Sequence, residues 1–336
     1  MGGCYSGSYR YSKPRAVKSE DDWISGFKKS LTKFKNSGNL VDLVKAYRAY
    51  IANKSSGFIA ELAKLKGIGD AADIPKEFPE IEYEVKFDIS VRGKGKEPEV
   101  VKYLDAFDFP PSNTARFLKD PMNTFAVGVN HFYGDSSDEM LVVIEKAGGV
   151  FLKEKGLVTP VESDSLYSSI VMKRTEKRWK ATLDEALQKV SELTKEKGIK
   201  YRGKIRKEKG DAFVLDTNDG RIYSFTITRA HLVLPGESNE SSTQRQLELE
   251  YAGYIPGFSG HTKDSEKELV SGMVDLAKYT YALYSHSPIT DGWKMDLQLT
   301  SERKYDFILG KNGKSLNHTV PLCLPLERRV RETVRV

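Results

Sequence analysis

In two short segments of the sequence, carboxylates stand at every second position and alternate with apolar side chains. Residues 81–87 read I-E-Y-E-V-K-F, so Glu82, Glu84 and Lys86 alternate with apolar residues. Residues 246–251 repeat this spacing with Glu248 and Glu250. Because successive side chains of a strand point to opposite faces, each segment predicts a strand with its charges on one face. Clustered carboxylates without a nearby histidine or cysteine favour Mg²⁺ or Mn²⁺, which prefer oxygen ligands.

Other strand-like segments carry rows of positive charge. Lysine and arginine bind phosphate oxygens, and arginine can do so with two parallel hydrogen bonds. Acidic and basic rows that face one cavity would suit a metal-bound phosphate chain, whose developing charge they would stabilise. The candidate phosphate-binding residues are Lys153, Lys155, Lys173, Arg174, Arg202, Lys204, Arg206, Arg229 and Lys304.

The direction of these charged faces decides the interpretation. A solvated outer face over an apolar core would explain any one of the strands taken alone. Long helices with apolar stripes, however, need an apolar sheet surface to cover. If the apolar faces of the strands contact these helices on the outside, the charged faces must point into the barrel. Unpaired buried charges are costly, so such an interior is expected to hold water, metal ions and a polyanion.

The spacing of apolar residues gives the elements that must position these charges. The turn Asn218-Asp219-Gly220 predicts a hairpin, because its central residues accept positive φ. Many strands with few helices argue against a doubly wound parallel sheet, which needs a crossover helix between successive strands. The predicted fold class is α+β, a closed antiparallel β-barrel (a tunnel) with helices packed on the outside. Strands are expected near 80–90, 123–133, 139–146, 149–155, 167–175, 200–208, 211–217, 221–229, 245–252 and 303–309, and long helices near 179–197 and 264–285.

Four regions are expected along the chain. Residues 1–20 lack periodicity and predict a disordered segment, and residues 21–75 show the three- and four-residue apolar steps of amphipathic helices. Residues 76–310 are expected to form the catalytic barrel, and 311–336 a C-terminal tail.

The sequence predicts a cytoplasmic protein. No run approaches the roughly 18 apolar residues that cross a bilayer, and no apolar leader follows the first basic residues. The net charge of +6 lies mostly at the two ends, at 1–20 and 327–336, which gives weak support for a nucleic-acid surface. Met1-Gly2-Gly3-Cys4-Tyr5-Ser6 fits the myristoylation pattern, with Gly2 as the acceptor and Cys4 available for a second acyl chain. Membrane association through these residues is one expectation, and an unmodified start is the other.

The ordered charges resemble a known family. Glu82-x-Glu84-x-Lys86 is similar to the E-x-E-x-K signature of the CYTH superfamily, the triphosphate tunnel metalloenzymes. The resemblance spans about residues 80–310, and the later charges follow in a similar order: Lys153 and Lys155, Lys173-Arg174, a helix, the row from Arg202 to Arg206, Asp216, Glu248-x-Glu250, a second helix and residues 301–305.

The resemblance implies an eight-stranded antiparallel tunnel that binds a triphosphate end to end with Mg²⁺ or Mn²⁺. It implies that Glu84 and Lys86 are catalytic, and that Lys86 orients or deprotonates the attacking water, a role that needs a lowered pKa. The basic residues named above would clamp the phosphate chain. The metal ligands it implies are Glu82, Glu84, Glu248, Glu250 and Asp216.

The function predicted from the sequence is a metal-dependent hydrolase that cleaves the terminal phosphoanhydride of inorganic triphosphate or a nucleoside triphosphate. An RNA 5′-triphosphatase and a nucleotidyl cyclase on the same fold stay open, and the first would make 5′-triphosphate RNA the only nucleic-acid partner. From another class comes a non-catalytic sensor of polyphosphate or nucleotide, with residues 21–75 as a helical unit that binds a protein partner.

Overall fold

In the computed structural model, the chain forms two compact units, Met1–Ala71 and Ala72–Val336. The structure describes residues 29, 30, 32, 33, 36, 81–107, 109, 116–119, 124–135, 140–147, 149–161, 170–233, 242–254 and 265–310. The described residues of the first unit are helical. Gly2, Cys4, most of the predicted helical region 21–75 and the tail 311–336 lie outside the described residues.

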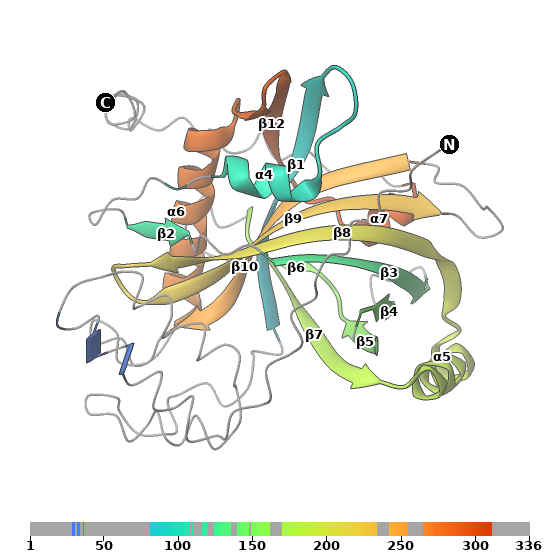
Figure 1. Cartoon of the computed structure of the whole chain (residues 1–336). Helices are drawn as coiled ribbons and strands as arrows, with labels where there is room; N and C mark the ends of the chain where they lie inside the picture. Colours follow the sequence, from blue (N-terminus) through green and yellow to red (C-terminus); the bar gives the residue numbers. More distant parts are fainter. Residues whose placement is uncertain are drawn as a thin grey trace. The chain divides into compact units, whose positions relative to one another are not determined.

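Eight strands of the second unit close into an antiparallel barrel, as the sequence predicted (Figure 1). The ring closes because β1 pairs with β10 on one side and with β7 on the other. In order around the barrel the strands are β1 (Ile81–Gly93), β10 (Ser242–Tyr254), β9 (Arg221–Val233), β8 (Lys200–Asp216), β3 (Thr124–Gly134), β4 (Met140–Lys146), β5 (Gly149–Lys155) and β7 (Met172–Ala181).

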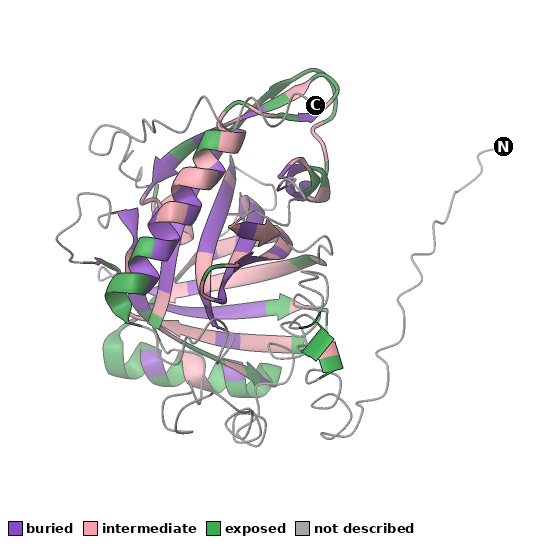
Figure 2. Ribbon diagram, turned by 90° about the vertical axis from the view of Figure 1, so that its left-hand side faces the viewer, coloured by how far each residue is buried: buried purple, intermediate pink, exposed green. Residues whose placement is uncertain are grey.

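Four short strands extend this ring. The second half of β1 pairs with β12 (Trp293–Thr300), and β12 pairs in turn with the preceding strand β11 (Pro288–Thr290). β2 (Phe117–Lys119) pairs with β8, and β6 (Thr159–Pro160) pairs with β7. In Figure 2 most strand residues are buried or half-buried, and exposed residues gather on helices and at hairpin ends.

The long helices cover the outside of the barrel. The helix α6 (Glu266–Tyr284) begins at Ser265, whose hydroxyl accepts from the Glu268 N–H at 3.2 Å. Its residues Met273 and Leu276 are buried in one apolar cluster with outward-facing residues of β1 and β10 such as Val85 and Leu249. Burial of this apolar surface is the main force that holds helix and sheet together.

Two further helices cover other parts of the outer surface. The helix α5 (Leu183–Lys197) starts with a capping box between Thr182 and Glu185, and buries Ala186 and Leu193 in a cluster with residues of β4 and β5. The short helix α4 (Val100–Ala106), which the sequence did not predict, lies over Gly210 of β8. A Cβ at this glycine would stand 3.3 Å from Val100 Cγ1, so the close contact explains why glycine continues the strand here.

The helix α7 (Lys304–Ile308) corrects the prediction of a strand over 303–309. Its first turn is fixed by Asp306, which accepts hydrogen bonds from the backbone N–H and side chain of Arg303. Tyr305 and Ile308 pack against apolar side chains that point into the barrel near the ends of their strands. These inward-facing residues are Phe132, Met140, Val142, Ile144, Ile205, Ala230 and Leu232.

Other sequence expectations differ from the structure in extent. The hairpin at Asn218-Asp219-Gly220 is confirmed, with Gly220 at φ 79° and its N–H bonded to Asp216 O at 2.9 Å. The two strands expected over 200–217 are one strand, and the boundary between β7 and α5 lies at Thr182, after the predicted helix start at 179. Among the described residues, no helix is both long enough and apolar enough to span a bilayer.

Candidate functional site

Three glutamates from two neighbouring strands meet inside the barrel. Glu82 and Glu84 share one face of β1, and the antiparallel register places Glu250 of β10 directly beside Glu84. One carboxylate oxygen from each of the three lies within 4.8 Å of the others. These three residues are called the carboxylate group below.

Cations from β5 and β7 surround this group. Arg174 registers with Glu82 across β1 and β7, donates a hydrogen bond to its carboxylate, and lies 3.8 Å from Glu84. Lys155 Nζ lies 3.4 Å from Glu82 and 2.6 Å from Glu176 of β7. Burial alone would raise the pKa of Glu82, but Arg174 and Lys155 hold it well below its usual value. Glu82 is therefore ionised at neutral pH.

Glu250 behaves differently from Glu82. Burial and the neighbouring charge of Glu82 raise the pKa of Glu250 to about 7. The carboxylate group thus carries a repulsion that a divalent cation would relieve, since a cation favours the charged form of each ligand. An all-oxygen donor set fits the hard cations Mg²⁺ and Mn²⁺. Glu82, Glu84 and Glu250 could therefore hold a divalent cation.

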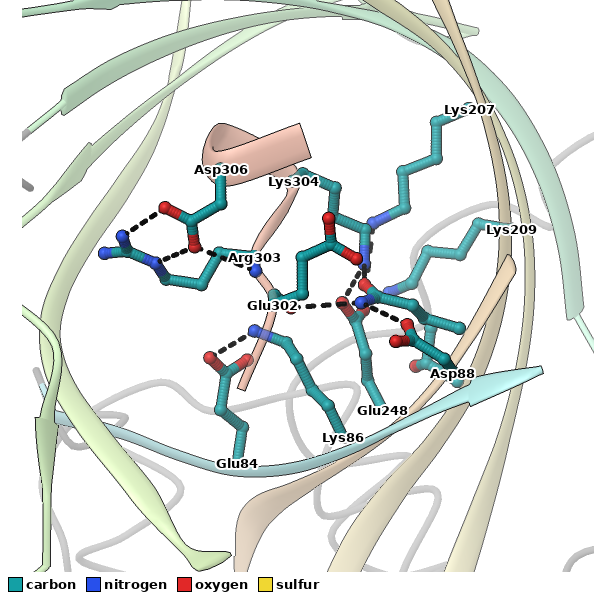
Figure 3. Close-up of polar contacts among 12 residues, drawn as sticks. Glu84, Lys86, Asp88, Lys207, Lys209, Glu248, Glu302, Arg303, Lys304 and Asp306 are labelled. Carbon is teal, nitrogen blue, oxygen red and sulfur yellow. Dashed lines mark hydrogen bonds and ion pairs between the residues drawn. The ribbon is translucent and has the colours of Figure 1, made fainter. Parts of the chain in front are cut away.

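Lys86 lies on the same face of β1, one step further along. Its Nζ donates to Glu84 Oε1 at 2.5 Å, and both side chains are almost fully buried. Figure 3 shows this pair pointing from β1 into the barrel. The short contact makes Lys86 a fixed hydrogen-bond donor beside the carboxylate group.

A second cluster of charges lies beside Lys86 and contains Glu248, Lys207 and Lys304. Glu248 accepts a hydrogen bond from Lys304 and lies 3.9 Å from Lys207 Nζ (Figure 3). Lys304 also donates to Gln246 Oε1 at 2.9 Å. Burial lowers the pKa of Lys207 to about 7, an effect that Glu248 opposes and that Lys304 and Lys209 increase.

The structure brings together most of the predicted acidic residues but separates two of them. Glu248 faces the same interior as Glu250, yet its contacts are with lysines and it is not part of the carboxylate group. Asp216, the fifth predicted ligand, lies on the outer face of β8, away from the carboxylate group. It is fully buried, accepts from Arg116 Nε at 2.9 Å and from the Asn218 N–H at 3.0 Å, and so holds the hairpin turn. The prediction that Asp216 belongs to the metal site is wrong.

Among the predicted phosphate-binding residues, Lys153, Lys155, Arg174 and Lys304 face the interior. Lys173 lies on the outer face of β7 and pairs with Glu266 of α6 at 2.9 Å. Lys204, Arg206 and Arg229 lie on the outer faces of β8 and β9, so the expectation that they line the cavity is wrong. Arg202 lies at the register shift between β3 and β8 and donates to Gly134 O at 3.0 Å.

The sequence reasoning missed the inward-facing lysines of β8, Lys207 and Lys209. The register pairs Lys207 with Ala230 and Lys209 with Thr228, on the inward faces of β8 and β9. Arg202, Lys204 and Arg206 alternate with the uncharged Gly203 and Ile205, and this pattern favours them as the charged face of the strand. Ile205 points inward nevertheless, because α7 makes that part of the interior apolar. Because residues 200–216 form one strand, Lys207 and Lys209 form a second alternating row of charge.

No protein-family model matches the sequence, and no curated protein sequence matches it either. Solved structures with a similar arrangement include the PH1819 protein from Pyrococcus horikoshii OT3, at 17% identity and a TM-score of 0.34 over 68% of this chain and 98% of that one. The PH1012 protein from the same organism matches at 14% identity and a TM-score of 0.32 over 59% and 88%. The S. pombe Pct1 RNA triphosphatase matches at 9% identity and a TM-score of 0.27 over 61% and 78%.

Proposed function

We propose that the protein is a divalent-metal-dependent hydrolase that cleaves the terminal phosphoanhydride of a triphosphate compound, with inorganic triphosphate and nucleoside triphosphates as the first candidates. One observation carries this proposal: three carboxylates lie within 4.8 Å of one another inside a closed barrel whose other walls present buried lysines and an arginine. Carboxylates alone would suit a cation, and cations alone would suit an anion. Both together suit a metal-bound phosphate chain.

The interior side chains have separate parts in this function. Glu82, Glu84 and Glu250 would hold Mg²⁺ or Mn²⁺, which when bound neutralises phosphate charge and favours attack by water. Lys153, Lys155 and Arg174 would bind phosphate oxygens, with Arg174 also orienting Glu82 through its hydrogen bond. Lys86 would orient Glu84 and a water beside the chain, because its Nζ is already fixed 2.5 Å from that carboxylate.

A phosphate-release assay with Mg²⁺ or Mn²⁺ tests the proposal. The substrates are inorganic triphosphate, ATP, GTP, thiamine triphosphate and a 5′-triphosphorylated RNA, and the products are separated by chromatography. Release of one phosphate per molecule supports a hydrolase and ranks its substrates, RNA included. Formation of a cyclic nucleotide with pyrophosphate would instead identify a cyclase, and tight binding without turnover would identify a sensor.

We also propose that the protein is cytoplasmic and that acyl chains on Gly2 and Cys4 bring it to membranes. The support is the sequence pattern at residues 1–6 alone. Mass spectrometry of the N-terminal peptide from the native source tests this. An unmodified Gly2 would contradict it.

A further inference from the structure

The barrel closes along a short stretch of pairing between β1 and β7, called the seam below. It joins Ile81–Glu84 of β1 to Met172–Thr175 of β7, and the pairing of β1 with β10 begins only at Glu84. Among the described residues, Glu82 therefore has β7 as its only strand neighbour. Because Arg174 lies opposite Glu82 in the same register, the placement of both interior side chains depends on the seam.

The outer face of the seam carries a junction of three residues. Tyr83 and Lys173 are register partners, and each is next in sequence to one of the interior residues Glu82 and Arg174. Both side chains donate to the same oxygen of Glu266 in the first turn of α6, Tyr83 Oη at 2.9 Å and Lys173 Nζ at 2.9 Å. One carboxylate thus bridges the two strands of the seam on the outside of the barrel.

The turn of α6 that carries this carboxylate has further anchors. Leu269, three residues after Glu266, is buried in the same apolar cluster as the ring of Tyr83. Glu268 Oε2 accepts a hydrogen bond from Arg221 of β9 at 3.2 Å. The first turn of α6 is therefore held by contacts with β1 and β9, and Glu266 extends this support to β7.

The members of the junction keep their donor and acceptor roles at neutral pH. Burial and Glu266 raise the pKa of Tyr83 above its usual value, so its hydroxyl stays protonated. Hydrogen bonds from Lys173 and Tyr83 lower the pKa of Glu266, so its carboxylate stays charged. Both hydrogen bonds are therefore charge-assisted, the stronger class of hydrogen bond in proteins.

We propose that Glu266 is a positioning residue for the candidate metal site: from the outside of the barrel it holds the seam together and so fixes Glu82 and Arg174 on the inside. The inference rests on the proposed function for the identity of the metal. It gives Lys173, which the sequence placed beside the phosphate chain, a role on the opposite face of the same strand. Residues that only orient the ligands of a metal contribute to its affinity in many proteins.

The first experiment compares E266A with E268A in the full-length protein. The two glutamates lie in the same turn of α6 and each accepts from a basic side chain, but Glu268 contacts Arg221 instead of the seam. Amide hydrogen exchange at 81–84 and 172–175 is expected to be about tenfold faster in E266A, because the seam opens more often, and unchanged in E268A. Equal exchange at the seam in the two variants would overturn the inference.

The second experiment is calorimetric titration with Mn²⁺ alone. E266A is expected to bind Mn²⁺ about fivefold more weakly than the wild type, because Glu82 is less well placed, and E268A within about twofold. Y83F and K173M each remove one donor and should cause part of the same loss. Neither should add to the loss in an E266A background, since residues that act as one unit are not additive. Unchanged Mn²⁺ affinity in E266A would also overturn the inference.

A cross-link separates positioning from a general loss of stability. Ile81 and Thr175 are register partners at one end of the seam, so I81C/T175C can form a disulfide between the paired strands. The variant also carries C4S and C323S, which leave no other thiol. In an E266A background, oxidation should restore Mn²⁺ affinity to within about twofold of the wild type, and reduction should remove the gain. A disulfide that forms without any recovery would contradict a positioning role.

The inference and the proposed function can fail separately. If no triphosphate compound is hydrolysed but E266A weakens Mn²⁺ binding and the disulfide restores it, the hydrolase proposal fails and Glu266 keeps its role. If hydrolysis occurs and E266A behaves as E268A does, only the inference fails. A wild-type protein that binds no Mn²⁺ would overturn both.

Discussion

The two faces of β8 carry the same residue types in different surroundings. On the outer face, Arg206 donates to Glu208 at 2.7 Å, and Arg229 of β9 donates to the same carboxylate at 2.8 Å. On the inner face, Lys207 lies 3.9 Å from Glu248, which also accepts from Lys304.

The outer charges form a continuous network with a structural role. Arg229 and Arg245 both donate to Glu97, which precedes α4, and Tyr103 of α4 donates to the same carboxylate at 2.6 Å. These contacts hold the start of α4 against the sheet. The comparison shows that side-chain type alone does not separate a binding cation from a structural one. The balance of neighbouring charge separates the two, because a cation whose charge is fully paired binds a ligand weakly.

The largest expected effect is on the inner face, at Glu84. E84Q should lower phosphate release about a hundredfold while the fold is retained, because it removes a charge from the carboxylate group and the partner of Lys86. Phosphate release and thermal unfolding measure the two properties. E154Q is the matched control, since Glu154 of β5 pairs with Lys189 on the outside. Unchanged turnover in E84Q would remove Glu84 from the site.

The next effect compares the faces of β8 directly. K209M should raise KM about tenfold through the loss of a cation that faces the phosphate chain, and R206M should leave kcat and KM unchanged. Steady-state hydrolysis of inorganic triphosphate measures both. Equal losses in the two variants would mean that the outer network also contacts substrate, and the distinction between the faces would fail.

A smaller effect concerns pH and the carboxylate group. Because burial and Glu82 raise the pKa of Glu250 to about 7, protons compete with Mn²⁺ for it, and Mn²⁺ affinity should increase as pH rises through 7. In the metal-free protein, the raised pKa adds stability that is fully present below about pH 4.5 and is lost as pH rises through 7. Calorimetry and urea unfolding at several pH values measure these trends.

The E250Q variant is the control for that dependence. In this variant, Mn²⁺ affinity and the free energy of unfolding should depend less on pH near pH 7, since the amide does not titrate. A profile that keeps the same slope in E250Q would assign the titration to another group.

The smallest expected effect on activity belongs to the outer network. E97Q should lower the free energy of unfolding by about 1 to 2 kcal/mol, because Glu97 accepts hydrogen bonds from Arg245, Tyr103 and Arg229. Catalytic constants should stay at wild-type values. Urea unfolding and phosphate release provide the two readings, and a loss of activity without a loss of stability would contradict the structural role.

Local sequence pattern determined the strands and the relative faces of their side chains. Alternation put Glu82, Glu84 and Lys86 on one face, and the helical spacing located α6 within two residues of its observed ends. The barrel also followed from pattern, because apolar faces needed helices to cover them. These features depend on backbone geometry within a few residues, which sequence records directly.

Tertiary structure alone decided which face of β8 points inward. Alternation assigns the side chains of a strand to two faces but does not show which face points inward. On β8 side-chain polarity indicates the wrong face, because α7 makes part of the interior apolar and Ile205 therefore points inward. The same packing turned residues 304–308 into a helix that delivers Lys304, and the register across β1 and β10 gave Glu248 lysine neighbours. Contacts between residues far apart in the chain decide these points, and a pattern confined to one segment does not contain them.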